Sequence, residues 1–353
     1  MKILIPILGF AKQGGYRVLS KLADSWVSMG HECTFLAPAT SDEPYFPTNA
    51  NVIYCGKFGI VEKNKKQKKA SGFDNIFSLY AGLRIVGREY DVLFANHSLT
   101  AWPVWLANCG SALKVYYVQA FEPGYYPFLK SPVKHVLSRL SYSLGLRKIV
   151  NSPSYPGVDS IATIPPGIDL SIFSLKQGYI DVGSKSEIVI GTIGRAEPYK
   201  GTATAIAAYR HLSAKNPNWK MKVAFGNVAP SDDYDIIKIK NDHELAEYYR
   251  SIDVLLVTCY SQHGAPHYPL IEAMACGTPV IHTDYYPGNE DNSWVAKSSD
   301  VDSVIEAVEG FFATSKENRI EKIRIARKTI EDHLSWEKVA NSFLEKINLV
   351  RFD

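Results

Sequence analysis

Short apolar runs alternate with helical patterns along this chain, and this alternation limits the folds it can adopt. An apolar run at 2–8 is followed by helical spacing over 16–29 and by another apolar run at 32–37. A strand, a crossover helix and a parallel strand form one right-handed unit, so this order predicts a parallel sheet with helices on its faces. Further strands are expected at 52–55, 92–95 and 115–119. The predicted fold class is α/β, with a doubly wound sheet.

A second alternating series begins with the apolar run at 188–193. It continues through expected helices at 201–214, 242–251 and 270–276 and expected strands at 220–225, 254–258 and 279–282. Between the two series, the residues Pro-Pro-Gly-Ile-Asp at 165–169 are typical of a turn, and the stretch up to 186 is polar. The sequence therefore predicts two Rossmann-like domains, at 1–165 and 187–334, with a linker at 166–186. The segment 317–349 has helical periodicity throughout.

Composition excludes several other classes of protein. The chain has 353 residues, of which 46% are hydrophobic and 21% charged, as expected of a globular protein with two domains. A net charge of only +3 argues against nucleic acid as the main partner. The five cysteines are odd in number and lack C-x-x-C spacing, which favours a reducing compartment, and we expect a cytoplasmic protein. No apolar run reaches the roughly 18 residues of a membrane-spanning helix.

Two segments of the second series carry groups that suit a nucleotide diphosphate. The first, 194–201, follows a predicted strand and presents Arg195 and Lys200. The second, 269–280, reads as a helix that begins with Pro269 and carries Glu272 on its first turn. Phosphates are bound by cations and by free N–H groups at a helix start, and a carboxylate accepts from ribose hydroxyls. Alternatively, Arg195 and Lys200 are a solvated pair of surface cations, and Glu272 only interacts favourably with the helix dipole.

These segments resemble the donor-binding motifs of retaining glycosyltransferases of family 4, which have the GT-B fold with two Rossmann-like domains facing a central cleft. The resemblance implies that Arg195 and Lys200 grip the diphosphate and stabilise the leaving group, and that Glu272 holds the ribose. It implies that the first domain binds the acceptor, the second binds the nucleotide sugar, and a C-terminal helix at about 335–353 packs back on the first domain. Neither a cofactor nor a metal ion is expected, since cations and a helix terminus offset the charge of the diphosphate.

The chain departs from the family pattern at one position of the donor loop. The first glutamate of the family's E-x7-E motif corresponds to Gly264. A neutral imidazole of His263 or His267 could replace it, or either could be a loop histidine without a role. Tyr268 is a further candidate for the donor site. The main-chain N–H groups of Leu270 and Ile271 are expected to face the diphosphate, and the nucleotide base is expected near the strand end at 225–226.

A subgroup of the family, the bacterial rhamnosyltransferases of the WsaF type, is similar to this chain at 266–272 and 118–127. The aspartate of the subgroup's V-Q-D-F-E-P segment is Ala120 here. The resemblance implies transfer of rhamnose from dTDP-rhamnose in cell-surface polysaccharide synthesis. The alternatives are a transferase that uses a UDP- or GDP-hexose, a GT-B nucleotide-sugar epimerase, and an inactive nucleotide-binding partner protein.

Candidates for the acceptor or the sugar lie at strand ends of the first domain. Glu122 could act as a base or orient an acceptor hydroxyl, with a salt-bridging loop acid as the alternative. Gln119 should line the interdomain cleft, and Tyr125 and Tyr126 could stack on a sugar ring or simply pack. His97 follows the strand at 92–95 and could bind acceptor or sugar, or be a structural histidine. Gly15 would allow close approach of the backbone to the donor, unless it only forms a tight turn.

Basic residues suggest a possible membrane contact. The run Lys63–Lys69 is most simply a solvated loop, but it could also contact anionic lipid head groups. Lys130, Lys134 and Arg139 stand among apolar residues and suggest a basic amphipathic surface. The expected acceptor is a glycan or a lipid-linked saccharide, and a lipid-linked acceptor would agree with both basic features. A peripheral location on the inner face of the plasma membrane would agree with them as well.

Overall fold

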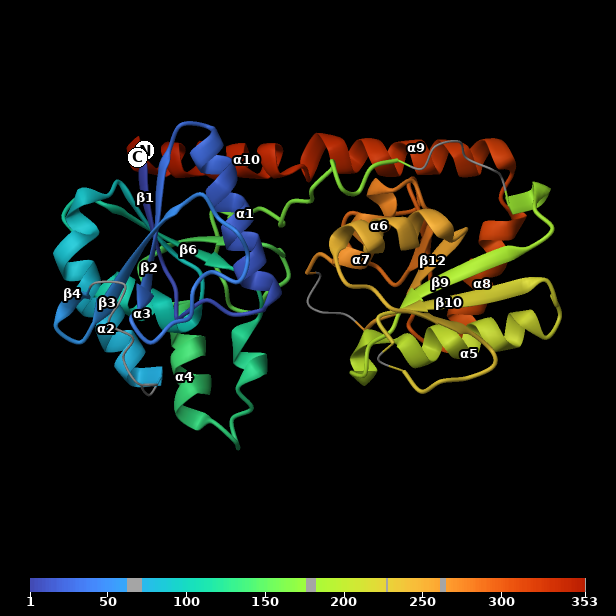
Figure 1. Ribbon diagram of the computed structural model, residues 1–353, viewed down its shortest axis with the longest axis horizontal. Coiled ribbons are helices and arrows are strands. Elements are labelled where there is room, and N and C mark those ends of the chain that lie inside the picture. The colour runs from blue at the N-terminus through green and yellow to red at the C-terminus, as the bar shows by residue number, and fades with distance from the viewer. Residues whose placement is uncertain (62–71, 176–181, 227, 261–264, 353) are drawn as a thin grey trace. The chain divides into compact units, whose positions relative to one another are not determined.

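The computed structural model describes residues 1–61, 72–175, 182–226, 228–260 and 265–352, and the run Lys63–Lys69, His263 and Gly264 lie outside them. The chain forms two compact units (Figure 1). The first unit comprises Met1–Gly167 and Trp336–Asp353, and the second comprises Ile168–Ser335.

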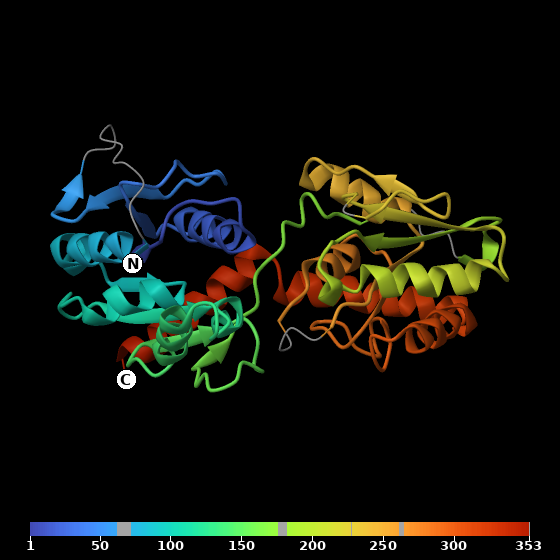
Figure 2. The ribbon, with the colours of Figure 1, turned by 90° about the horizontal axis from the view of Figure 1, so that it is seen from below.

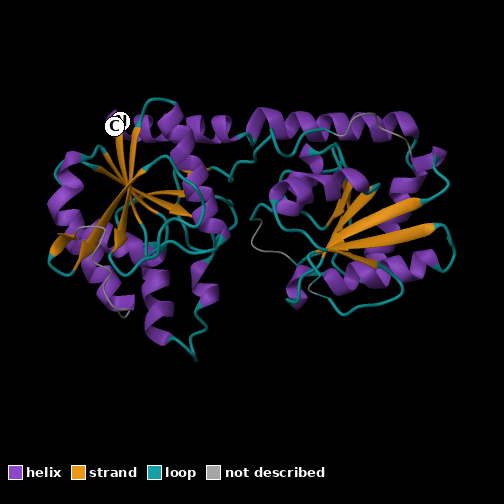
Figure 3. Ribbon diagram, viewed as in Figure 1, coloured by secondary structure: helices purple, strands orange, loops and turns teal. Residues whose placement is uncertain are grey.

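The first unit contains one sheet between layers of helices (Figures 1 and 3). Its described strands follow the order β4-β3-β2-β1-β5-β6-β7-β8, parallel except for the β3–β4 pair. The order reverses between β1 and β5, which makes that point the topological switch of a Rossmann-like sheet. The strands are β1 (Lys2–Pro6), β2 (Glu32–Pro38), β3 (Asn51–Gly56), β4 (Gly59–Val61), β5 (Val92–Ala95), β6 (Leu113–Val118), β7 (Arg147–Val150) and β8 (Ala162–Thr163). The α-helices are α1 (Gly14–Ser28), α2 (Gly72–Val86), α3 (Ser98–Leu106), α4 (Pro132–Ser141) and α10 (Trp336–Phe352).

The C-terminal helix α10 belongs to the core of the first unit. Its Phe343 packs edge-on against Trp26 of α1, with ring centroids 5.9 Å apart, and against Tyr117 of β6 at 4.8 Å. The indole N–H of Trp26 donates to the carbonyl of Ala340 at 3.1 Å. All three rings are fully buried, so α10 contributes to the stability of a unit whose other residues, Met1–Gly167, are far away in sequence.

The second unit repeats the architecture with a sheet in the order β11-β10-β9-β12-β13-β14, all parallel (Figure 2). Here the order reverses between β9 and β12. The strands are β9 (Ile188–Ile193), β10 (Trp219–Ala224), β11 (Asp235–Ile237), β12 (Val254–Val257), β13 (Val280–His282) and β14 (Trp294–Val295). The α-helices are α5 (Thr202–Ser213), α6 (Asp242–Ser251), α7 (Tyr268–Ala275), α8 (Val301–Ala313) and α9 (Lys316–His333).

Two details differ from the sequence-based expectation. From Ile168 on, the predicted linker at 166–186 belongs to the second unit, because Phe173 is fully buried in its core and the N–H of Ile168 donates to the carbonyl of Leu334 at 2.7 Å. The predicted helix at 317–349 is divided into α9 and α10. Ser335 pairs with Ile168 in a parallel bridge, so the chain leaves the helical path at this point.

No helix within the described part of the chain is both long and apolar enough to cross a membrane. All five cysteines are buried with free thiols.

Candidate functional site

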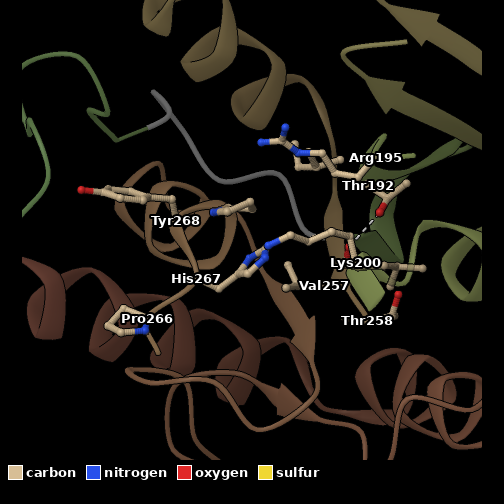
Figure 4. Close-up of a pocket in the computed structure, with 11 residues that line it drawn as sticks. Thr192, Arg195, Lys200, Val257, Thr258, Pro266, His267 and Tyr268 are labelled. Carbon is tan, nitrogen blue, oxygen red and sulfur yellow. Dashed lines mark hydrogen bonds between the residues drawn. The ribbon is translucent and has the colours of Figure 1, made fainter. Parts of the chain in front are cut away.

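The candidate site lies in the second unit, at the switch point between β9 and β12. Ligands of open α/β sheets bind beyond the carboxyl ends of the strands at such points. The loop after β9 supplies Arg195 and Lys200, and the segment before α7 supplies His267 (Figure 4). The pocket is lined by Thr192, Ile193, Arg195, Lys200, Leu256, Val257, Thr258, Pro266, His267, Tyr268 and Pro269.

Gly201 fixes the path of the loop that carries Lys200. Its φ is +73°, and a Cβ at this position would lie 2.0 Å from the carbonyl oxygen of Thr258. The hydroxyl of Thr258 donates to the carbonyl of Gly201 at 2.7 Å, and the N–H of Tyr260 donates to the carbonyl of Tyr199 at 2.9 Å. The backbone after β9 is therefore held against the end of β12, at a distance that no other residue type permits.

The two cations differ in exposure, and neither has an ion-pair partner in the described parts of the chain. Arg195 is exposed, and its guanidinium lies 5.8 Å from the ring centroid of Phe225. Lys200 is half-buried, and burial lowers the pKa of its ammonium group. The side chain of Lys200 extends toward His267 (Figure 4). The pocket thus has two positive groups and no carboxylate among its lining residues, which favours an anionic ligand.

His267 brings a buried polar atom to the pocket wall. Its Nδ1 is buried and has no hydrogen-bond partner among the described residues. Burial, and then the nearby Lys200 and Arg195, lower the pKa of the imidazole to about 3, so the ring is neutral near pH 7. Buried polar atoms are nearly always hydrogen-bonded in folded proteins. A neutral imidazole with an unsatisfied nitrogen next to two cations is therefore suited to a polar ligand.

The start of α7 corrects the expected role of two residues. The helix begins at Tyr268, so Pro269 is its second residue and the helix starts earlier than predicted. As a result, the N–H groups of Leu270 and Ile271 donate to the carbonyl of His267 at 3.1 and 3.3 Å. Both side chains are fully buried. These N–H groups are used by the helix itself and do not face a diphosphate, whereas His267 and Tyr268 do line the pocket.

Glu272 also differs from its expected place. It lies on the second turn of α7, and its side chain is buried rather than on the pocket wall. Its Oε2 accepts from the hydroxyl of Tyr249 at 2.8 Å. The interpretation as a first-turn acid, whether for the ribose or for the helix dipole, assumed a later helix start. This geometry does not support the predicted contact between Glu272 and a ribose.

In the first unit, His97 stands at the equivalent switch point, directly after β5. The side-chain amide of Asn96 donates to the carbonyl of Pro6 at 2.7 Å and so ties the end of β5 to the end of β1. His97 caps α3, since its Nδ1 accepts from the N–H of Leu99 at 3.0 Å. This bond places the proton of the neutral ring on Nε2, which lies 3.4 Å from the hydroxyl of Tyr126.

Glu122 is a buried structural acid rather than an exposed base. Its Oε2 accepts from the N–H of Ser98 at 2.7 Å, at the start of α3, and its Oε1 accepts from the hydroxyl of Tyr116 at 3.0 Å. Oε2 also lies 3.4 Å from His97 Nδ1. Both oxygens are occupied and the residue is 3% exposed, so Glu122 stabilises the helix start that positions His97. Its expected action as a catalytic base is not supported by this geometry.

Two of the remaining first-unit candidates lie close together. Gly15 lies in the first turn of α1, and a Cβ there would be 3.6 Å from the side-chain oxygen of Gln119, so these two come together. Tyr125 is exposed. Tyr126, the second of the two tyrosines, has its hydroxyl 3.4 Å from His97 Nε2. Sequence reasoning missed Tyr116, which donates to Glu122 and whose only signal is its place on a buried strand.

Metal-ligating residues do not gather within the described ranges, where no group of three or more His, Cys, Asp or Glu side chains is placed to hold an ion.

The second unit matches a known family. Residues 181–328 match the family model described as "Glycosyl transferases group 1". A D-inositol 3-phosphate glycosyltransferase of Stackebrandtia nassauensis is 28% identical over 152 residues, which cover 35% of this chain and 33% of the relative. A relative with the same description from Arthrobacter sp. is 28% identical over 148 residues. The match thus spans about a third of the length of these curated relatives.

The fold of the whole chain is that of GT-B glycosyltransferases, with two Rossmann-like units. Sucrose-phosphate synthase from Thermosynechococcus elongatus aligns with a TM-score of 0.73 at 15% identity, over 99% of both chains. The Anabaena protein Alr3699/HepE, solved in complex with UDP-glucose, aligns with a TM-score of 0.68 at 13% identity, over 99% of this chain and 100% of its own. WaaG, a glycosyltransferase involved in lipopolysaccharide biosynthesis, aligns with a TM-score of 0.63 at 16% identity, over 96% of this chain and 98% of its own.

Proposed function

We propose that this chain is a glycosyltransferase that moves a sugar from a nucleotide diphosphate donor to an acceptor hydroxyl, with retention of the anomeric configuration. One observation carries the proposal. At the switch point of the unit that matches the family model, two cations without an ion-pair partner in the described chain share a pocket with a buried nitrogen that lacks a hydrogen bond. A sugar diphosphate has negative charge that would pair with the two cations and hydroxyl groups that would hydrogen-bond the histidine nitrogen.

In this proposal Arg195 and Lys200 stabilise the diphosphate as it leaves the sugar. Negative charge on the leaving oxygen grows in the transition state, and fixed cations in a partly buried site lower the energy of that state most strongly. The neutral ring of His267 hydrogen-bonds the sugar or the phosphate next to it, in place of the glutamate that family members carry at the position of Gly264. Tyr268 lines the same wall.

The nucleotide base is proposed to lie next to Phe225. This residue follows β10 with a φ of +72°, a conformation that costs energy for a residue with a Cβ. Its ring remains partly exposed beneath the guanidinium of Arg195. Strained residues of this kind are concentrated at ligand sites, and an exposed ring offers a stacking surface to a base.

The acceptor is proposed to bind the first unit, as a glycan or a lipid-linked saccharide. The residue proposed to contact it is His97, because Nδ1 is used by the cap of α3 and Nε2, next to the hydroxyl of Tyr126, is the ring nitrogen left for a ligand. Glu122 is a positioning residue for it. The resemblance to the rhamnosyltransferases suggests dTDP-rhamnose as the donor, a cytoplasmic location and a role in cell-surface polysaccharide synthesis. The second candidate for the donor is a UDP-hexose, because the Anabaena protein of similar fold was solved with UDP-glucose.

The test is a panel of dTDP-rhamnose, UDP-glucose, UDP-N-acetylglucosamine and GDP-mannose. The true donor should raise the melting temperature, and mass spectrometry should detect a glycosylated product with a saccharide acceptor. Proton NMR of that product should show the anomeric configuration of the donor. Conversion of the donor without an acceptor would indicate an epimerase instead, and binding without turnover on any acceptor would indicate an inactive nucleotide-binding protein.

A further inference from the structure

Helix α4 exposes its apolar side chains and buries its serines. Ser138 and Ser141 are fully buried against the first unit, and their hydroxyls donate to backbone carbonyls of the same helix, at 2.9 Å for Ser138 and 2.7 Å for Ser141. By contrast Val133, Val136 and Leu140 are 58%, 43% and 49% exposed. These three stand at i, i+3 and i+7, so they form one stripe along the helix. The orientation is the reverse of that expected for a helix on the surface of a globular protein.

The apolar stripe continues into the segment before the helix. Phe128 and Leu129 are 57% and 95% exposed. The indole N–H of Trp102 in α3 donates to the carbonyl of Leu137 at 3.1 Å, which anchors α4 to the body of the unit. In Figure 1, α4 and the chain before it extend away from the rest of the first unit. An anchored helix with an exposed apolar stripe of this size is a typical feature of a binding surface.

The charged residues of the same region are all basic. Between Glu122 and Asp159 the sequence contains five lysines and arginines and no acidic residue. Of these, Lys130, Lys134 and Arg139 are exposed and stand beside the apolar stripe. A symmetric contact with a second copy would bring these like charges together. A surface of anionic lipid head groups over an apolar interior matches both the cations and the stripe.

We propose that Phe128, Leu129, Val133, Val136 and Leu140, together with Lys130, Lys134 and Arg139, form a surface that binds an anionic lipid bilayer; we name it the α4 surface. The apolar side chains enter the head-group region, and the three cations contact the phosphate groups. The inference does not depend on the proposed function, because it concerns a surface of the first unit and requires no turnover.

The experiment is co-sedimentation of the full chain with vesicles of phosphatidylcholine, with and without about 25% phosphatidylglycerol. The protein should bind the anionic vesicles, and binding should weaken as salt rises. The double variant Leu129→Glu with Val133→Glu should bind at least about tenfold more weakly, since it adds two negative charges and removes apolar contacts. The matched control is Leu349→Glu with Ile320→Glu, two exposed positions on α10 and α9 that should leave binding unchanged.

Circular dichroism and thermal melting of both double variants show that the fold is kept. The proposal is overturned if the chain does not bind anionic vesicles, if it binds neutral vesicles equally well, or if the two double variants bind alike. It is also overturned if sedimentation velocity without lipid shows a dimer that the α4 variant abolishes, because a second copy would then cover the surface.

Discussion

The switch points of the two units place charged groups in opposite environments. In the first unit the carboxylate of Glu122 is buried, and both of its oxygens accept hydrogen bonds from the protein. In the second unit Arg195 and Lys200 point into a pocket and form no ion pair within the described ranges, beside a histidine nitrogen that lacks a partner. The two sheets have corresponding switch points but use charge differently: in the first unit the charge stabilises the fold, and in the second unit we propose that it binds a ligand.

The largest effect is expected from Gly201→Ala. The new Cβ would lie 2.0 Å from the carbonyl oxygen of Thr258, and the φ of +73° adds strain, so we expect a loss of at least about 3 kcal/mol in the free energy of unfolding. Gly30→Ala is the matched control in the first unit, with a φ of +85° and open space around the Cβ. Its cost should be about 1–2 kcal/mol. Urea unfolding that gives equal losses would contradict the close approach of loop and strand.

Acid should destabilise the second unit through its buried neutral histidines. Burial lowers the pKa of His282 from 6.5 to about 4, so the unfolded chain takes up a proton before the folded one does. Stability is therefore complete above pH 6.5 and falls as the pH drops toward 4, by about 3 kcal/mol from this residue.

The measurement is the free energy of urea unfolding at several pH values between these limits. His282→Asn should make the dependence less steep, because the amide keeps polar groups near Ser293 and Tyr285 but does not titrate, while the contribution of His267 remains. His333→Asn, an exposed position on α9, should leave it unchanged. Curves of equal slope for all three proteins would show that His282 does not cause the loss.

A smaller effect is expected from Glu122→Gln, which tests the structural role of charge in the first unit. The bond to the N–H of Ser98 loses its ionic character, so we expect a loss of about 1–2 kcal/mol in the free energy of unfolding and no change in nucleotide affinity. The exposed Glu89→Gln should change stability by less than about 0.5 kcal/mol. A Glu122→Gln protein of wild-type stability and altered activity would instead restore the catalytic interpretation.

The sequence predicted the strands that define both switch points, because β1, β5, β9 and β12 are short and mostly apolar runs. It also placed Arg195 and Lys200 correctly in the loop after β9. It misplaced the N–H groups of Leu270 and Ile271, since a proline can be the first or the second residue of a helix and only the three-dimensional path decides which.

The burial of Glu122 could not be read from the sequence either. Its partners are Ser98, which is 24 positions away, and Tyr116, a residue of a buried strand, and these contacts form only when the sheet and α3 come together. In the same way, the outward apolar stripe of α4 has the same periodicity as an inward one. Periodicity shows that a helix is amphipathic, while packing determines which of its faces is buried.

The central claim is that the second unit holds a diphosphate between Arg195 and Lys200. Isothermal titration with UDP and dTDP tests it most directly. Arg195→Ala and Lys200→Ala should each weaken the tighter-binding nucleotide by about 1.5–3 kcal/mol, or about 10- to 150-fold, while Lys215→Ala, an exposed lysine of the same unit, should bind like the wild type. Unchanged affinity in both pocket variants would contradict the account.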